Sequence, residues 1–240
     1  MPFDQTDSPL RDAYTPETLL PEPLPADPFP LFRDWFEEAR DRRVQPNPNA
    51  MTLATPHADG SVSARIVLCK HLVVDPGWVV FFTNYHGRKG RALAETARAA
   101  AVLHWDLLDR QVRLEGPVVR SPGEESDAYF ASRRLESRLG AHASDQSEPI
   151  GSRAELLAKV EETARRFGLD PSRPLDEQQA DIPRPPHWGG YRLIPERLEL
   201  WAGGPGRVHD RAVWTRSVVV DAGSGGLADS GMWQATRLQP

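Results

Sequence analysis

The sequence predicts an α+β protein that is mainly β, built as a small barrel with flanking helices. Between residues 50 and 121, short apolar runs are separated by tight turns such as HADG at 57–60 and DPG at 75–77. Further short runs follow between residues 189 and 222. Several short strands joined by tight turns are typical of a small barrel.

The composition excludes several classes of protein. Hydrophobic residues make up 39% and charged residues 26% of the 240 residues, as in a globular protein. The formal net charge of −5 argues against a general nucleic-acid binder. A single cysteine, Cys69, allows no intrachain disulfide and no cysteine-rich metal site, and the seven histidines lack metal-ligand spacing, so we expect no metal.

The expected cellular location follows from the same kind of sequence features. No apolar run approaches the ~18 residues of a membrane span, and the N-terminus lacks the apolar stretch of a signal peptide. We therefore expect a cytoplasmic protein with no membrane and no nucleic-acid partner.

The first predicted elements are an arm and a helix. Residues 1–25 are rich in proline and predict a flexible N-terminal arm, which leaves residues 26–240 as one domain. In the segment 27–43, Phe32, Trp35 and Ala39 recur at helical spacing, so we expect an amphipathic helix lying on a core.

The barrel strands and one helix come next. The helix is expected over 88–97, where RKGRALAETA follows a glycine turn. The strands are expected in AMTLATP (50–56), SVSARIVLCKHLVV (61–74), WVVFFTN (78–84), AAAVLHWDLL (99–108) and RQVRLEGPVVRS (110–121).

Two capping boxes predict two more helices. Ser121 and Glu124 would begin a helix that carries Tyr129 and Arg133, and Ser152 and Glu155 would begin another, which Gly168 ends. After them we expect a proline-rich linker (169–186), strands in GGYRLIP, RLELWAG, RVHDRAVWTR and SVVVDA, a flexible loop (223–231) and a final segment (232–240).

Polar residues lie where a helix should bury apolar ones. On a continuous helix Tyr129, Arg133 and Ser137 fall within an arc of about 80°, a face of hydroxyl, guanidinium and hydroxyl. Such a face is either simply solvated or suited to an anion.

Basic residues gather at three other places. On one strand Arg65 and Lys70, five residues apart, would face opposite sides and serve two ligands or two parts of one site. Beside Thr83, the cations Arg88 and Lys89 begin a helix, which makes a plausible phosphate site or merely a soluble helix start.

The third place is GRVHDR, where Arg207, His209 and Arg211 would share one strand face at period two. Such a face is costly to bury without a partner, unless it faces solvent. No dinucleotide or P-loop glycine motif and no serine nucleophile elbow is present. Several anion sites on a barrel indicate one phosphorylated ligand or two.

These residues resemble a known family. RIVLCKH, FFTNYHGRKG, RQVRLEG, YFASRRLESRLGAHASDQS, WGGYRLIPERLELWAGGPGRVHDR and the terminal RLQP together resemble pyridoxamine 5′-phosphate oxidase, from about residue 25 to residue 240. The resemblance implies an FMN-binding split β-barrel that works as a homodimer with active sites shared between subunits. It also implies oxidation of pyridoxamine or pyridoxine 5′-phosphate to pyridoxal 5′-phosphate, with O2 as the acceptor and H2O2 as the by-product.

Site residues are implied by the same resemblance. The cofactor positions are Arg65, Ile66, Val67, Leu68, Lys70, Phe82, Thr83, Arg88, Lys89, Gln111, Gln146, Ser147, Trp201 and Arg211. The substrate positions are Lys70, Tyr129, Arg133 and Ser137 around the phosphate, with Arg207 and His209 over the ring as the catalytic pair. For His209, proton removal and simple orientation stay open as alternatives. The arm offers Arg11 and Tyr14, which resemble a segment that can close over the active site.

The chain departs from the family pattern at four positions. His142 stands where tryptophan is common, Ala202 where glutamine is usual, His104 where proline often precedes the tryptophan, and Phe82 where tyrosine is common. Two other functions stay open: a related FMN-dependent oxidase of the phenazine-pathway type, and a non-catalytic protein that binds flavin or pyridoxal phosphate. Lys70, Tyr129, Arg133 and Ser137 favour the first interpretation over the phenazine type, which tends to lack them.

Overall fold

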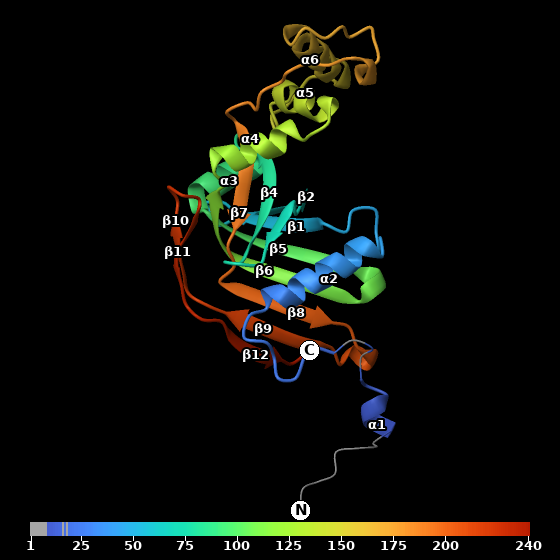
Figure 1. The fold of residues 1–240 in the computed structure, drawn as a ribbon, viewed down its shortest axis with the longest axis vertical. Helices are drawn as coiled ribbons and strands as arrows, with labels where there is room; N and C mark the ends of the chain where they lie inside the picture. The colour runs from blue at the N-terminus through green and yellow to red at the C-terminus, as the bar shows by residue number, and fades with distance from the viewer. Residues whose placement is uncertain (1–8, 16, 18) are drawn as a thin grey trace, which may run out of the picture.

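A computed structural model of the chain describes residues 9–15, 17 and 19–240. Figure 1 shows a sheet at the centre of an elongated molecule, with α2 lying across it and α4, α5 and α6 gathered at one end. The helices are α1 (Pro9–Asp12), α2 (Phe29–Asp41), α3 (Arg88–Thr96), α4 (Gly123–Ala131), α5 (Leu135–Ala143) and α6 (Arg153–Arg166), with 3-10 turns η1 (Asp106–Leu108), η2 (Leu175–Glu177) and η3 (Pro205–Arg207).

Ten strands form one antiparallel sheet and two more form a separate ribbon. Seven of the ten lie in the order β12-β9-β8-β6-β5-β1-β2. The strands are β1 (Ala50–Pro56), β2 (Val62–Leu68), β3 (His71–Val73), β4 (Trp78–Asn84), β5 (Arg98–Trp105), β6 (Arg110–Arg120), β7 (Trp188–Leu193), β8 (Arg197–Ala202), β9 (Asp210–Thr215), β10 (Val218–Asp221), β11 (Gly226–Ser230) and β12 (Gln234–Leu238). The predicted mixed, mainly β class is confirmed.

The sheet branches at its longest strand. The first part of β6 pairs with β8, and its last residues, 118–120, pair with β7, which continues through β4 to β3. Within the described ranges, β2 pairs only with β1 and β3 only with β4, so the hydrogen-bonded ladder does not close. The barrel is therefore split, and the gap between its two branches lies where the cationic residues gather.

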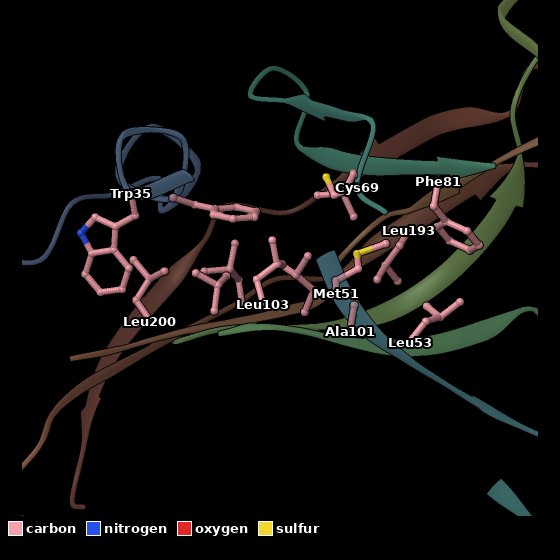
Figure 2. Packing of buried hydrophobic residues seen from close by; sticks show 14 of the residues in the cluster. Trp35, Met51, Leu53, Cys69, Phe81, Ala101, Leu103, Leu193 and Leu200 are labelled. Atoms are coloured by element: carbon pink, nitrogen blue, oxygen red, sulfur yellow. The ribbon is translucent and has the colours of Figure 1, made fainter. Parts of the chain in front are cut away.

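Helix α2 covers one face of the sheet as predicted. Phe29, Phe32 and Ala39 are fully buried, and Figure 2 shows Trp35 packed near Leu200 of β8. Burying each large apolar side chain stabilises the fold by roughly 1.5–3 kcal/mol. This face of the sheet is therefore a closed core, and the ligand site must lie elsewhere.

Of three predicted helix ends, two are confirmed and one is wrong. Ser152 accepts the N–H of Glu155 at 3.1 Å and Gly168 ends α6 with φ of +75°, as predicted. The capping box at Ser121 is wrong: α4 begins at Gly123 after Pro122, and the Ser121 hydroxyl is buried without a hydrogen-bond partner. The backbone N–H of Ser121 instead pairs with the Gly190 carbonyl of β7 at 3.0 Å.

The two ends of the chain are more structured than predicted. Part of the expected loop 223–231 forms β11, which pairs with β10, so that prediction is wrong. Residues 20–25 of the expected arm lie on the core: Leu20 is buried, and the Pro25 carbonyl accepts the Trp214 indole N–H at 2.8 Å. The boundary at residue 25 itself stays a prediction, and residues 1–8, 16 and 18 lie outside the described residues.

The described residues contain neither a membrane-spanning helix nor a metal-binding cluster. No helix there is both long enough and apolar enough to cross a bilayer. Across residues 9–15, 17 and 19–240, no group of three or more His, Cys, Asp or Glu side chains is placed to hold a metal ion.

Candidate active site

One cavity of about 590 Å³ opens between the two branches of the split sheet and the helices α4 and α5. Its volume is in the usual range for a small-molecule site. It is lined by Arg65, Ile66, Val67, Leu68, Lys70, Phe82, Thr83, Lys89, Tyr129, Ser132, Arg133, Arg134, Ser137, Gln146 and Trp188. Twelve of these fifteen are residues that the sequence predicts for the site.

The charge of this cavity is one-sided. Its lining includes five cations, Arg65, Lys70, Lys89, Arg133 and Arg134, and no aspartate or glutamate. Within the part of the chain that the structure describes, none of the five forms an ion pair. Cations held together without carboxylates favour the binding of an anion from outside the chain.

One end of the cavity is built around Lys89, in the first turn of α3. Its ammonium donates to Gln146 Oε1 at 2.5 Å and to Thr83 Oγ1 at 3.0 Å. Arg65, on the edge strand β2, donates to the Leu53 carbonyl at 3.0 Å and to Thr55 Oγ1 at 2.8 Å. Neutral oxygens therefore orient both cations without neutralising them.

The segment that carries Gln146 docks on the start of α3. Ser147 Oγ accepts the backbone N–H of Arg88 at 3.1 Å. A Cβ at Gly87, the N-cap of the helix, would lie 2.7 Å from Gln146 Oε1, so a larger residue there would displace the amide that Lys89 contacts. The exposed Arg88 side chain does not line the cavity, but its charge still acts on Arg65.

Burial and repulsion perturb these cations. Desolvation, with a further contribution from Arg65, lowers the pKa of Lys89 to about 8. Desolvation first and Arg88 second also lower the pKa of Arg65. Both shifts have the sign expected when cations are gathered in an anion site that no carboxylate shares.

The pKa of Lys89 makes anion binding depend on pH. An anion favours the charged ammonium, whose proton is lost as the pH rises through about 8 in the free protein. The Kd for FMN, the cofactor that the family resemblance implies, should therefore be flat below that pH and rise by up to about tenfold per pH unit above it. Fluorescence titration of apoprotein between about pH 7 and about pH 9.5 measures this, well above the second phosphate pKa near 6. Lys89→Gln should bind weakly at every pH, and an equally steep rise in that variant would exclude Lys89 as the titrating group.

The other end of the cavity holds the residues expected on one helix face. The expectation of one continuous helix is wrong. α4 ends at Ala131 and α5 begins at Leu135, so Arg133 lies in a turn between them. The turn forms because Ser132 Oγ donates to the Tyr129 carbonyl at 2.8 Å and Arg134 takes an extended conformation. Tyr129, Arg133 and Ser137 still line the cavity together.

Lys70 reaches the same cavity as Arg65 because the strand is interrupted. β2 ends at Leu68 and β3 begins at His71, so the strand alternation that would separate the two cations does not extend to Lys70. The Lys70 ammonium lies 5.7 Å from the centroid of the Tyr129 ring. Both cations line one cavity, which favours two parts of one site over two separate ligands, and the expectation of opposite strand faces stays a prediction.

A second cluster of predicted residues lies away from the cavity. Gln111 of β6 pairs with Trp201 of β8, which pairs with Arg211 of β9. The His209 ring lies 4.6 Å from the Trp201 ring. With the exposed Arg207, these residues form the second cluster, and none of them lines the cavity that Arg65 and Lys89 share.

The predicted strand face in this cluster is also wrong. β9 begins only at Asp210, and Arg207 ends the η3 turn with φ of +65°. Arg211 is paired with the buried carboxylate of Glu199 at 2.6 Å. The backbone N–H of Gly204 donates to His209 Nδ1 at 3.1 Å, so in the neutral ring the proton is on Nε2.

Comparisons with known proteins identify the family of the chain. A family model described as "Pyridoxamine 5'-phosphate oxidase" matches residues 37–166, and one described as "Pyridoxine 5'-phosphate oxidase C-terminal dimerisation region" matches residues 188–240. The chain belongs to the pyridoxamine 5′-phosphate oxidase family. The predicted membership is confirmed, and with it the enzyme class, an oxidoreductase.

Relatives agree with this family over nearly their whole length. A "Pyridoxine/pyridoxamine 5'-phosphate oxidase" of Burkholderia multivorans is 48% identical over 231 residues, which are 96% of this chain and 97% of that protein. A protein of the same name from Paraburkholderia phymatum is 47% identical with the same coverage.

Solved structures of the family share the fold. PhzG from Burkholderia lata, described in complex with tetrahydrophenazine-1-carboxylic acid, is 30% identical, with a TM-score of 0.77 over 93% of this chain and 98% of that one. An FMN-binding protein from Nostoc punctiforme, described as related to pyridoxamine 5′-phosphate oxidase, has a TM-score of 0.61 at 17% identity, over 87% of this chain and 97% of that one. The fold class predicted from the sequence is confirmed.

The departures from the family pattern lie mostly outside the cavity. His142 is held by the Pro183 carbonyl at 2.8 Å and packs edge-on against Phe167, Ala202 is fully buried, and His104 is exposed on β5. Only Phe82 lines the cavity, where its ring stacks on Tyr129 with centroids 4.0 Å apart.

Three lining residues were missed by sequence reasoning: Ser132, Arg134 and Trp188. The doubled arginine of SRRLESR and the tryptophan of HWGGYR are visible in the sequence, but no periodicity assigns them to a cavity. The arm adds a contact outside the cavity: a Cβ on Gly206 would lie 2.5 Å from the Tyr14 ring, so Tyr14 covers the turn that carries Arg207.

Proposed function

We propose that this protein oxidises pyridoxamine 5′-phosphate and pyridoxine 5′-phosphate to pyridoxal 5′-phosphate, with FMN as cofactor and O2 as electron acceptor. The alcohol and O2 give the aldehyde and H2O2, and the amine additionally consumes water and releases ammonia. The observation that carries the proposal is the cavity, whose described lining has five cations and no carboxylate, with one group of contacts around Lys89 and another around Tyr129. Relatives that are 46–48% identical and bear this activity in their names support it.

The residues present fit FMN at the Lys89 end. Lys89, Arg65 and the nearby Arg88 would hold the cofactor phosphate, and Thr83, Gln146 and Ser147 would orient those cations and the ring system. The edge-strand residues Ile66, Val67 and Leu68 would lie along the flavin. When bound, FMN accepts a hydride equivalent from substrate and passes the electrons to O2.

The residues at the other end fit a phosphate ester. Such a group carries close to two negative charges and three strong acceptor oxygens. Arg133 would donate to it as a fork, Lys70 as a point charge, and Tyr129 and Ser137 through hydroxyl groups. Gripping this end fixes the reacting carbon at one place along the cavity.

His209 is proposed to orient the substrate and not to remove a proton from it. Its Nδ1 accepts the Gly204 N–H, which leaves Nε2–H as a donor toward the bound ring. A ring that donates at Nε2 cannot take a proton there. Arg207, on the neighbouring turn, would cover the same ligand with its positive charge.

A homodimer explains why the predicted site falls into two clusters. The C-terminal dimerisation region, residues 188–240, contains Trp201, Arg207, His209 and Arg211. We propose that this cluster, with Gln111, completes the cavity of the partner subunit. The cytoplasm remains our proposed location, since the one cysteine is buried and unpaired.

A shared site can be tested by mixing two inactive variants. Arg133→Ala damages the cavity, and the double variant Arg207→Ala/His209→Ala damages the second cluster. Co-refolded in equal amounts, they should recover about a quarter of wild-type activity, because about half of the dimers are mixed and each mixed dimer has one intact site. Each variant refolded alone is the control, and a mixture no more active than the two controls would mean that each subunit builds its own site.

The function itself is tested with an oxygen electrode. FMN-loaded protein should consume O2 and form H2O2 with either phosphorylated vitamer, at a kcat/KM at least about 100-fold above that for pyridoxine without phosphate. Tetrahydrophenazine-1-carboxylic acid, the compound bound in the PhzG structure, tests the phenazine-type alternative. Turnover of that compound alone would replace our proposal with the phenazine type, and binding of pyridoxal 5′-phosphate without turnover of any substrate would indicate a non-catalytic protein.

A further inference from the structure

The Arg133 guanidinium is held in an unusual way. It lies in the turn between α4 and α5, where no helix fixes its direction, and it forms no ion pair among the described residues. Its Nη1 is buried and has no hydrogen-bond partner among the residues that the structure describes. Desolvation lowers the pKa of this arginine. Something other than hydrogen bonds to acids must therefore orient it.

Two aromatic rings supply that orientation. The Arg133 Cζ atom lies 4.6 Å from the centroid of the Trp188 ring and 5.4 Å from that of Phe130. A cation over an indole face is attracted by the ring quadrupole, most strongly where water is excluded. Trp188 is only 7% exposed and lines the cavity, so this contact is largely shielded from solvent.

The Trp188 ring is itself fixed from several sides. Its backbone N–H donates to the Pro185 carbonyl at 3.1 Å, and its carbonyl accepts from Arg184 Nη1 at 2.7 Å. Phe82 stacks on its ring with centroids 5.6 Å apart and an interplanar angle of 12°, and Phe130 meets it at 69°. The Tyr129 ring is parallel to it within 7°.

Stacking differs from ion pairing in what it leaves free. A carboxylate would occupy the N–H donors of Arg133, whereas an aromatic ring attracts the cation without accepting strong hydrogen bonds from those donors. We propose that Trp188 is a positioning residue, which holds the Arg133 fork ready for the phosphate ester of the substrate. This inference rests on the proposed role of Arg133 and adds a residue that acts through it.

The test compares ligand binding in four proteins. Kd values for pyridoxal 5′-phosphate and for pyridoxal are measured on FMN-loaded wild type, Trp188→Leu, Arg133→Ala and the double variant. Trp188→Leu should raise the Kd for pyridoxal 5′-phosphate at least about tenfold, and that for pyridoxal by less than about twofold. In the Arg133→Ala background the same substitution should add almost nothing, because the group it positions is gone.

Further variants separate positioning from a general effect on folding. Trp78 holds Arg192 at the same 4.6 Å but does not line the cavity, so Trp78→Leu is the matched control and should leave the Kd unchanged. Trp188→Phe keeps a smaller ring and should raise the Kd only about two- to fivefold. If Trp188→Leu does not fold, Trp188→Phe with and without Arg133→Ala carries the test.

Two results would overturn the inference: an equal loss of affinity for pyridoxal, or an undiminished effect of Trp188 in the Arg133→Ala background. Because binding is measured without turnover, the outcome is independent of the oxidase assay. A protein without oxidase activity whose phosphate-dependent binding needs both residues would keep this inference and lose the proposed function. An active oxidase whose Kd for pyridoxal 5′-phosphate is unchanged by Trp188→Leu would keep the proposed function and overturn this inference.

Discussion

Replacing Arg65 and Lys89 together with alanine should give a protein that purifies without flavin and stays colourless. Both side chains line the FMN end of the cavity, and neither has a carboxylate partner among the described residues. Charge-assisted hydrogen bonds contribute roughly 1.5–3 kcal/mol each, so losing two should raise the Kd for FMN by about 10²- to 10⁴-fold. The ratio of absorbance at the flavin band to that at the protein band reports occupancy directly.

The control for this variant must remove the same charge elsewhere. Arg40 and Arg98 are exposed and ion-paired on the surface, with Asp41 and Glu196. Arg40→Ala/Arg98→Ala should therefore purify as yellow as the wild type. The Arg65/Lys89 variant should also stay folded, since removing unpaired, desolvated cations relieves repulsion. A yellow, fully occupied Arg65→Ala/Lys89→Ala protein would refute the cofactor site.

Strand boundaries were predictable where the local pattern alone decides them. The predicted strands 50–56 and 78–84 match β1 and β4, and α2 lies inside the predicted 27–43, because alternation and helical spacing report which side chains face a core. Cationic clusters were predictable too, since Arg65, Lys89 and their neighbours stand out against strand and helix patterns. Periodicity alone does not show that these cations line one cavity.

Breaks in elements were the main source of wrong predictions. Counting residues from Tyr129 to Ser137, or from Arg65 to Lys70, assumes one continuous element, and in both cases the chain leaves it. The Ser132 hydroxyl donates to the Tyr129 carbonyl, and just after β2 ends at Leu68 the Asn49 side-chain amide donates to the Cys69 carbonyl at 2.9 Å. These are competitions between side-chain and backbone hydrogen bonds, which a periodic pattern does not encode.

Contacts between residues far apart in the sequence were predictable only through the resemblance to the family. Gln146 reaches Lys89 across 57 residues of sequence, and no local signal connects them. The second cluster was still harder to predict, because within one chain His209 does not line the cavity that Lys70 lines. If the proposed dimer is correct, the spacing of these residues was selected between two copies of the chain and not within one.

Removing the Arg133 guanidinium should raise the KM for the substrate and leave the FMN content unchanged. This result would distinguish the substrate end of the cavity from the cofactor end. Arg133→Ala should raise the KM for pyridoxine 5′-phosphate by about 10- to 150-fold, the loss of one charge-assisted interaction. FMN content should be unchanged, because Arg133 lies at the other end of the cavity from Lys89. Steady-state kinetics and the flavin absorbance of the same sample measure both quantities.

The substrate and a conservative variant sharpen this test. Pyridoxine without phosphate has nothing for Arg133 to grip, so its already low kcat/KM should change by less than about twofold. Arg133→Lys keeps the charge but loses the planar fork that stacks on Trp188, and we expect a KM between those of wild type and Arg133→Ala. Equal losses with both substrates would show that Arg133 shapes the cavity as a whole. An unchanged KM for the phosphorylated substrate would show that the phosphate is bound elsewhere, and the buried Nη1 atom would then have no anion to explain it.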